Sequence, residues 1–201
     1  MTSKITVPLT LLVLAGAAFA QEQEPHQFFD EAVPAQAVET AGPLTTHQLL
    51  DMKRKALEAL YKTLPPGPIP DGKSDGIASR EPGTVFGKIS QKVLGAFWQG
   101  KVFDREHGQL INRLTTGEMV KAKVFVGESW LDGKPAIIID YKDTSHIAGF
   151  IRDEIREAAP GVYFGFAYER QQDGSAHANI IFALDFNSPN APKAADETVP
   201  E

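Results

Sequence analysis

The chain of 201 residues contains no cysteine. Disulfide bonds, thiol catalysis and cysteine-ligated zinc are therefore excluded. Positive charge is also in short supply, since 20 Lys and Arg stand against 26 Asp and Glu. An acidic chain with scattered lysines has no electrostatic footprint for nucleic acid, so no nucleic-acid partner is expected. The same overall balance disfavours attraction to anionic membranes.

Signatures of metal, phosphate and acyl chemistry are missing as well. No two of the five histidines, at positions 26, 47, 107, 146 and 177, have the spacing of metal ligands. The pair Gly161 and Gly165 falls in a predicted strand and not in a strand-to-helix phosphate loop. There is no Gly-x-Ser-x-Gly nucleophile elbow. We therefore expect no metal and no cofactor.

Long apolar runs are scarce, and the one that stands out lies at residues 5–19. It follows Lys4, is interrupted by Pro8 and ends at Ala18-Phe19-Ala20. The run is shorter than the roughly 20 residues that span a bilayer. Residues 1–20 are thus predicted to be a cleaved signal peptide, with no transmembrane span after cleavage. A periplasmic or secreted protein is expected, and the lack of cysteine favours the periplasm.

Composition divides the remainder into three parts. Residues 21–44 are rich in Pro, Gln, Glu and Ala and are predicted to be a disordered leader. Residues 187–201 are predicted to be a disordered tail. Residues 45–186 are expected to form a single domain.

Two segments have helical periodicity. Thr45 or Thr46 is a suitable cap for a helix over 46–64, which Pro65-Pro66 ends. Its apolar face comprises Leu49, Leu50, Leu57, Leu60, Tyr61 and Leu64. A short helix is predicted over 84–94, where Val85, Phe86, Ile89, Val93 and Leu94 share a face.

From Trp98 onward the apolar period changes to two, with turn residues at short intervals. This pattern predicts strands near 98–104, 108–114, 118–127, 134–142, 151–158, 161–170 and 176–186. Short loops make neighbouring strands antiparallel. The fold class is therefore mainly β: an antiparallel barrel of about seven or eight strands with an N-terminal helix, or alternatively a β-sandwich.

The charged segment 152–157 is the strongest candidate site. A strand is preferred here over a helical turn, because Pro160-Gly161 favours a hairpin. Arg152, Glu154 and Arg156 then share one face. If that face is the barrel interior, they form a polar floor for an anionic head group. The alternative is a solvated outer face, or a structural Arg–Glu pair.

Aromatic residues supply the rest of the candidate site. Trp98 is predicted to plug one end of the barrel, because glycines on either side allow close backbone approach. Tyr141 and Tyr163 are candidates for hydroxyls that orient a ligand in an apolar pocket, although core packing is the simpler interpretation. Asp140, Ser145 and His146 are interpreted as part of a polar turn.

The chain resembles a family of uncharacterised bacterial proteins marked by a Gly-x-Trp-x-Gly-like motif. The matching segments are 97–104 (Phe-Trp-Gln-Gly-Lys-Val-Phe-Asp), 129–134 (Ser-Trp-Leu-Asp-Gly-Lys), 139–141 (Ile-Asp-Tyr) and 152–163. Here Ala96-Phe97 precedes Trp98, and the nearest upstream glycine is Gly95. The resemblance covers about 65–186 and implies a lipocalin-like barrel, with no activity attached.

Three functions follow as hypotheses. The first is an exported, non-catalytic protein that binds a small apolar or amphiphilic ligand, with Arg152 and Arg156 near any anionic end. The second is a small acid–base enzyme that acts on a lipid or aromatic compound through Asp140, Asp153 or Glu154. The third is an envelope-associated interaction protein whose helix 46–64 docks a partner.

Overall fold

The computed structural model describes residues 43–116 and 119–188, which contain nine strands and three helices. The predicted signal peptide, nearly all of the leader and nearly all of the tail lie outside the described residues. The strands are β1 (Gly72–Lys73), β2 (Asp75–Ser79), β3 (Trp98–Asp104), β4 (Gln109–Leu114), β5 (Met119–Glu128), β6 (Pro135–Asp140), β7 (Ile151–Ala159), β8 (Val162–Arg170) and β9 (Ala176–Asp185).

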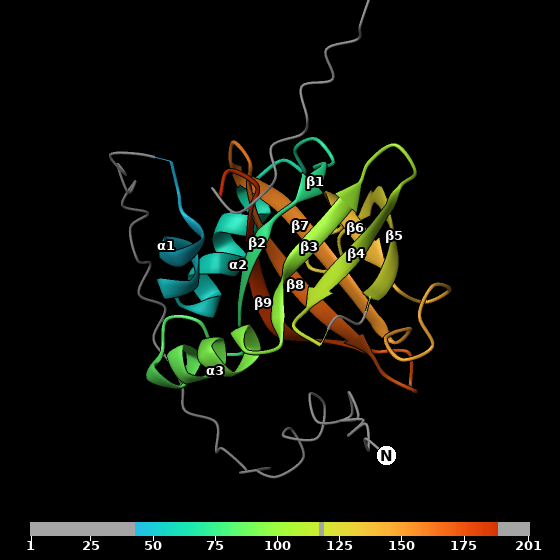
Figure 1. The fold of residues 1–201 in the computed structure, drawn as a ribbon. Helices are drawn as coiled ribbons and strands as arrows, with labels where there is room; N and C mark the ends of the chain where they lie inside the picture. Colours follow the sequence, from blue (N-terminus) through green and yellow to red (C-terminus); the bar gives the residue numbers. More distant parts are fainter. Residues whose placement is uncertain (1–42, 117–118, 189–201) are drawn as a thin grey trace, which may run out of the picture. The chain divides into compact units, whose positions relative to one another are not determined.

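All nine strands belong to one antiparallel sheet (Figure 1). From β3 to β9 each strand pairs with the next along the chain, as short loops dictate. The mainly β, antiparallel barrel is confirmed, and so are its seven predicted strands. The segment 151–157 is a strand, not a helical turn. Two short strands, β1 and β2, raise the count above the expected seven or eight.

The two short strands nearly close the sheet into a barrel. β1 pairs with β3 at one edge, β2 pairs with β9 at the other, and Ser74 alone separates them in the chain. The Ser74 hydroxyl donates to the Lys101 carbonyl at 3.0 Å and accepts from the Lys101 N–H at 3.2 Å. Closure removes the exposed strand edges of an open sheet.

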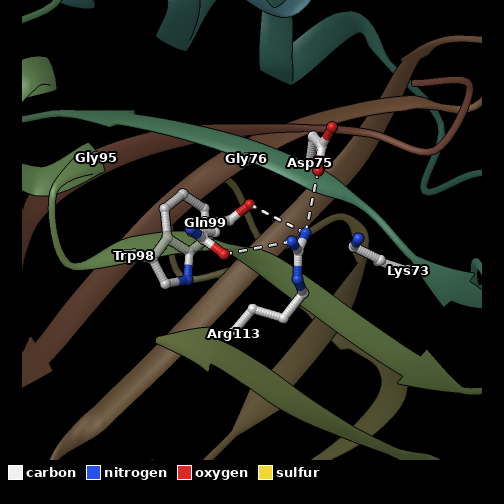
Figure 2. Close-up of a pocket in the computed structure, with 7 residues that line it drawn as sticks. All are labelled: Lys73, Asp75, Gly76, Gly95, Trp98, Gln99 and Arg113. Atoms are coloured by element: carbon white, nitrogen blue, oxygen red, sulfur yellow. Dashed lines mark hydrogen bonds and ion pairs between the residues drawn. The ribbon is translucent and has the colours of Figure 1, made fainter. Parts of the chain in front are cut away.

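Trp98 and Gly76 meet at the seam between β2 and β3 (Figure 2). A Cβ on Gly76 would lie 2.5 Å from Cη2 of Trp98 and 2.8 Å from Cα of Gly100, so glycine is required. A bulge separates Trp98 from Gly100, whose φ of 131° also suits glycine. β3 begins at Trp98, which agrees with the predicted strand start.

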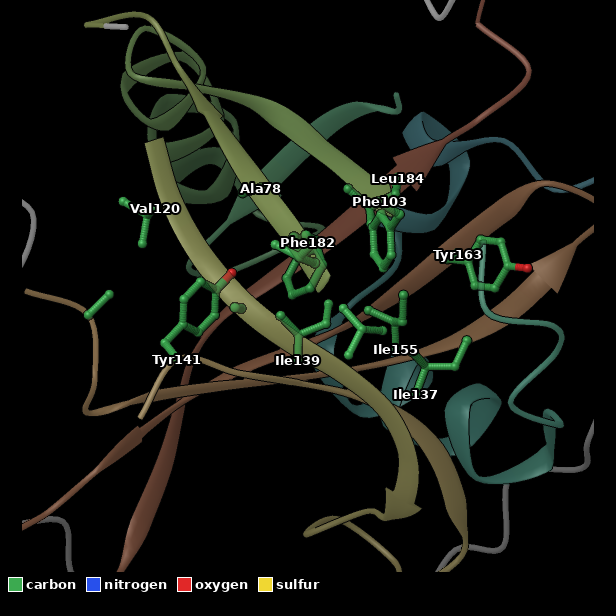
Figure 3. Packing of buried hydrophobic residues seen from close by; sticks show 14 of the residues in the cluster. Ala78, Phe103, Val120, Ile137, Ile139, Tyr141, Ile155, Tyr163, Phe182 and Leu184 are labelled. Carbon is green, nitrogen blue, oxygen red and sulfur yellow. The ribbon is translucent and has the colours of Figure 1, made fainter. Parts of the chain in front are cut away.

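The sheet buries apolar side chains on both faces. The interior face carries residues such as Phe103, Ile139, Ile155 and Phe182, which converge in the space that the strands enclose (Figure 3). The exterior face of β6–β9 carries a second cluster that includes Ile138, Phe164, Phe166 and Ile181. Strand alternation places neighbouring residues in opposite clusters.

The exterior cluster is covered by α1 (Thr46–Asp51) and α2 (Arg54–Thr63), through Leu49, Leu50, Leu57 and Tyr61. The single helix predicted over 46–64 is therefore wrong, since extended backbone at Met52 and Lys53 divides it. No Pro or Gly marks this break. Packing of both helices on the sheet overrides local helix propensity. Thr45 caps α1, and Gln48 completes a capping box.

α3 (Val85–Gly95) confirms the second predicted helix to within a residue at each end. The Thr84 hydroxyl caps it by accepting from the N–H of Gly87. Leu94 packs in the interior cluster, whereas Val85, Phe86, Ile89 and Val93 are exposed. Within residues 43–116 and 119–188, no helix combines the length and apolarity needed to cross a membrane.

Candidate functional site

Strand β7 delivers charge to both faces of the sheet. Arg152, Glu154 and Arg156 share one face, as the strand pattern predicts, but it is the exterior face beneath α2. The condition for a polar floor inside the barrel, an inward face, is therefore not fulfilled, and the outer-face alternative describes their position. Asp153 and Ile155 point into the barrel instead. Sequence periodicity of two defines the two sets but does not say which set is inside.

Arg156 fastens three segments together on the exterior face. Its guanidinium donates to both carboxylate oxygens of Asp132, at 2.7 and 2.8 Å, and to the carbonyl of Tyr61 at 2.7 Å. It also donates to the carbonyls of Lys134 and Pro135. These contacts join β7 to the end of α2 and to the β5–β6 turn. Bidentate Arg–carboxylate pairs with this many partners are typical of structural anchors.

Glu154 is buried beside Arg156 and has its own partners. Its carboxylate accepts from the Ser129 hydroxyl at 2.5 Å, from the Trp130 N–H at 2.7 Å and from Arg152. The Arg152 guanidinium stacks 4.1 Å from the ring centre of Trp130 and donates to the Glu128 carbonyl. The Arg–Glu pair that was the structural alternative is thus present, and it orders the β5–β6 turn.

A second group of polar side chains lies inside the barrel; we call Trp98, Lys101, Asn112, Tyr141 and Asp153 the interior polar cluster. The ammonium of Lys101 donates to Asp153 Oδ2 at 2.8 Å, to the Tyr141 hydroxyl at 2.7 Å and to Asn112 Oδ1 at 2.9 Å. Strands β3, β4 and β7 supply four of these residues, and Tyr141 directly follows β6, so the fold brings them together from positions far apart in sequence.

Hydrogen bonding in the interior polar cluster is nearly complete. The Tyr141 hydroxyl accepts from Asn112 at 2.7 Å and donates to Asp153 Oδ2 at 3.1 Å. The Trp98 indole N–H donates to Asn112 Oδ1 at 3.0 Å. Among the described residues, Asp153 Oδ1 is buried and has no hydrogen-bond partner. The cluster therefore contains one buried acceptor without a hydrogen bond, and such an atom lowers the stability of the folded state.

Aromatic rings lie close to the Lys101 ammonium, which pairs with the same Asp153 carboxylate. Lys101 lies 5.2 Å from the ring centre of Phe182 and 5.7 Å from that of Trp98. Burial, together with the neighbouring Asp153 carboxylate, raises the pKa of Tyr141 well above its usual range. Its phenol therefore stays protonated at physiological pH and acts as a hydrogen-bond donor, not as a base.

An open pocket of about 470 Å³ borders the seam at Trp98 (Figure 2). Gly76, Gly95 and Gln99 also line it. Arg113 closes one side, donating to Asp75 at 3.1 Å and to the Ser74 carbonyl at 2.8 Å. Trp98 thus contacts both this surface pocket and, through its indole N–H, the interior polar cluster.

The remaining predicted residues lie elsewhere. Tyr163 packs in the interior cluster of apolar residues but donates its hydroxyl to the Pro68 carbonyl at 2.8 Å, away from Asp153. Asp140 accepts twice from Arg170 at 2.9 Å. The Ser145 hydroxyl accepts from the N–H of Ala148 at 3.1 Å, within the polar turn. Of the six predicted binding residues, only Trp98 and Tyr141 belong to the interior polar cluster.

Sequence reasoning missed Lys101 and Asn112, and it named Asp153 only as a candidate acid–base residue. A signal was present: Lys101 and Asn112 are polar residues in phase with the inward apolar residues Phe103, Leu110 and Leu114. Polar residues at core positions of an alternating strand indicate a buried network. The described residues contain no group of three His, Asp or Glu side chains arranged to hold a metal ion.

The chain matches no protein-family model and no curated protein. Among solved structures, it is similar to a protein from Thermomonospora curvata, at 22% sequence identity and a TM-score of 0.43. The likeness covers 67% of this chain and 87% of that one. Both measures are low, and the barrel is assigned here from its own strand pairing. The resemblance to the Gly-x-Trp-x-Gly family stays a prediction.

Proposed function

We propose that the protein binds a small, mainly apolar ligand that carries a hydroxyl or N–H group, and that this group donates to Asp153 Oδ1. The observation that carries the proposal is the one acceptor that the interior polar cluster leaves unmet. A ligand donor would complete the network, while apolar side chains such as Phe182 contact its remainder.

A purely structural role explains this cluster less well. A buried ion pair generally adds little stability over well-packed apolar residues of the same volume. Lys101 and Asp153 are both buried, in a barrel whose other inward side chains are mostly apolar. Polar groups kept at such a cost, with one atom unmet, are typical of binding sites.

The chemistry of the cluster selects the kind of ligand. Three neighbours occupy the Lys101 ammonium, so it offers nothing further to an anionic head group. Asp153 presents a carboxylate oxygen, which repels anions and accepts from O–H or N–H donors. The ligand's polar end is therefore a donor, in place of the anionic end expected near Arg152 and Arg156.

The tryptophans provide a direct test. The chain has two, and the Trp130→Phe variant leaves Trp98, whose indole N–H contacts Asn112 of the cluster, as the sole reporter. Titration with 1-dodecanol should change Trp98 fluorescence in a saturable way, and dodecanoate should bind more weakly. Asp153→Asn in the same background, at a temperature where circular dichroism shows it folded despite the lost ion pair with Lys101, should weaken dodecanol binding about ten-fold, because an amide replaces the carboxylate acceptor.

Asp143→Asn is the matched control, because Asp143 is an exposed carboxylate paired with Lys123. It should leave the dodecanol titration unchanged. The proposal fails if no probe gives a saturable change, or if dodecanoate binds as well as dodecanol and Asp153→Asn has no effect. The proposal retains the exported location predicted from residues 1–20.

A further inference from the structure

Helix α3 presents an apolar stripe to the surroundings. The exposed fractions are 81% for Val85, 54% for Phe86, 56% for Ile89 and 55% for Val93. Phe97, just beyond the helix, continues the line at 42%. The spacing of these residues places them on one side of the helix. Contiguous exposed apolar surface of this kind marks an interaction site.

The opposite side of α3 is fixed to the barrel, so the stripe cannot turn inward. The Ser90 hydroxyl lies 3.3 Å from the Ser79 hydroxyl of β2 and accepts from the Arg80 N–H, directly after β2, at 3.2 Å. A Cβ on Gly87 would lie only 1.9 Å from the carbonyl oxygen of Glu81. Leu94 is buried among the interior apolar residues. Helix and barrel therefore present the stripe as one rigid surface.

Charge on α3 is of one sign. Between Val85 and Gly95 the charged residues are Lys88 and Lys92, both exposed and one turn apart along the flank of the stripe. Lys88 lies 3.9 Å from Asp51, an exposed contact of little strength. The acidic balance of the whole chain thus does not apply locally, because this helix carries positive charge beside its apolar stripe.

We propose that α3 docks on the surface of an anionic lipid bilayer. The apolar stripe would enter the boundary between head groups and acyl chains, while Lys88 and Lys92 face lipid phosphates. Charge complementarity selects this occupant over a second copy of the chain. Two α3 helices face to face would bring four lysines together, whereas an anionic head-group layer attracts them.

This inference stands independently of ligand binding. It rests on exposed residues of α3, and the proposed ligand site rests on buried residues of the barrel. The two meet at Gly95, which ends α3 and lines the pocket at Trp98. Docking through α3 would hold that pocket close to the bilayer, where mainly apolar ligands partition.

Vesicle flotation of the signal-free full chain tests the proposal. Vesicles of phosphatidylcholine with about a third phosphatidylglycerol should carry the protein upward, and pure phosphatidylcholine should carry much less. Phe86→Ser/Ile89→Ser should reduce the floated fraction about ten-fold. Lys88→Gln/Lys92→Gln should abolish the preference for phosphatidylglycerol.

The control is Phe125→Ser/Val126→Ser, which removes two apolar side chains of similar exposure from β5. It should float as the unaltered protein does, and circular dichroism should be unchanged in every variant. The proposal is overturned if the protein does not float, or if the β5 variant loses as much binding as the α3 variant. It is also overturned if sedimentation velocity shows a dimer that the α3 variant dissociates while vesicles bind neither protein.

Discussion

Lys101 and Asp153 form a buried ion pair in the barrel interior. Their charged atoms lie 2.8 Å apart, with both side chains buried. The attraction between the two charges offsets the free-energy cost of burying each of them away from water. The pair is therefore sensitive to loss of either partner but tolerant of the loss of both.

We predict that Lys101→Met lowers the free energy of unfolding by about 3–5 kcal/mol, because it leaves Asp153 buried without its counter-charge. Urea unfolding at neutral pH measures the change. Lys101→Met/Asp153→Leu should recover most of the loss, since two apolar residues can pack where the charges were. A single variant within about 1 kcal/mol of the unaltered protein would contradict the burial of this pair.

At the scale of elements, Arg156 of β7 determines how α2 and the β5–β6 turn attach to the barrel. It bonds the Tyr61 carbonyl in the last turns of α2 and both carboxylate oxygens of Asp132 in the turn. The Tyr61 ring also lies 4.3 Å from the guanidinium carbon. One side chain thus anchors two elements at once.

Arg156→Leu should cost about 3–5 kcal/mol in unfolding free energy and should speed amide exchange in α2 more than in β4. Arg54→Ala is the control, since Arg54 pairs with Glu58 at 3.8 Å on the half-exposed surface of α2. That pair should contribute less than about 1 kcal/mol. An equal loss of unfolding free energy in the two variants would show that Arg156 does not anchor α2 and the turn.

The same pair has a pH dependence of known sign. Hydrogen bonding from Arg156 lowers the pKa of Asp132 below its ordinary value. A lowered folded-state pKa gives stability that is present above the unfolded value and is lost as the pH falls through the folded one. The cost of Arg156→Leu should therefore shrink as unfolding is measured below about pH 4.

What the sequence could and could not reveal is clearest at β7. The alternation of Arg152, Asp153 and Glu154 follows from a period of two and was predictable. Their assignment to inside or outside depends on where α1 and α2 pack, which local pattern does not encode. Lys101 and Asn112 join the interior polar cluster only through contacts with Tyr141, which follows β6, and with Asp153 of β7. Their partners are distant in sequence, so no local motif marks them.

For the molecule as a whole, the seam between β2 and β3 decides whether the sheet is a barrel or an open meander. The seven strands from β3 to β9 were predictable because local turns pair them. β1 and β2 were not, since strands of two and five residues exist only through tertiary pairing with β3 and β9.

Gly76→Ala should weaken this closure, because the added Cβ meets Trp98 and the backbone of Gly100. We expect a loss of about 1–3 kcal/mol in unfolding free energy, with faster amide exchange in β2 and β3 than in β5 and β6. Gly95→Ala is the matched control, since nothing lies within 4 Å of its added Cβ. Uniform exchange rates in the Gly76 variant would show that the seam does not control closure.

The strand order also determines which strand pairs can form early in folding and which must form last. β2 comes early in the described chain, yet its partner β9 is the last strand of the sheet. The hairpins from β3 to β9 can form one after another from local contacts, but β2 must wait for the final strand. Long-range pairings of this kind are slow to form. During synthesis, the chain therefore completes its barrel only after residues 176–185 have left the ribosome.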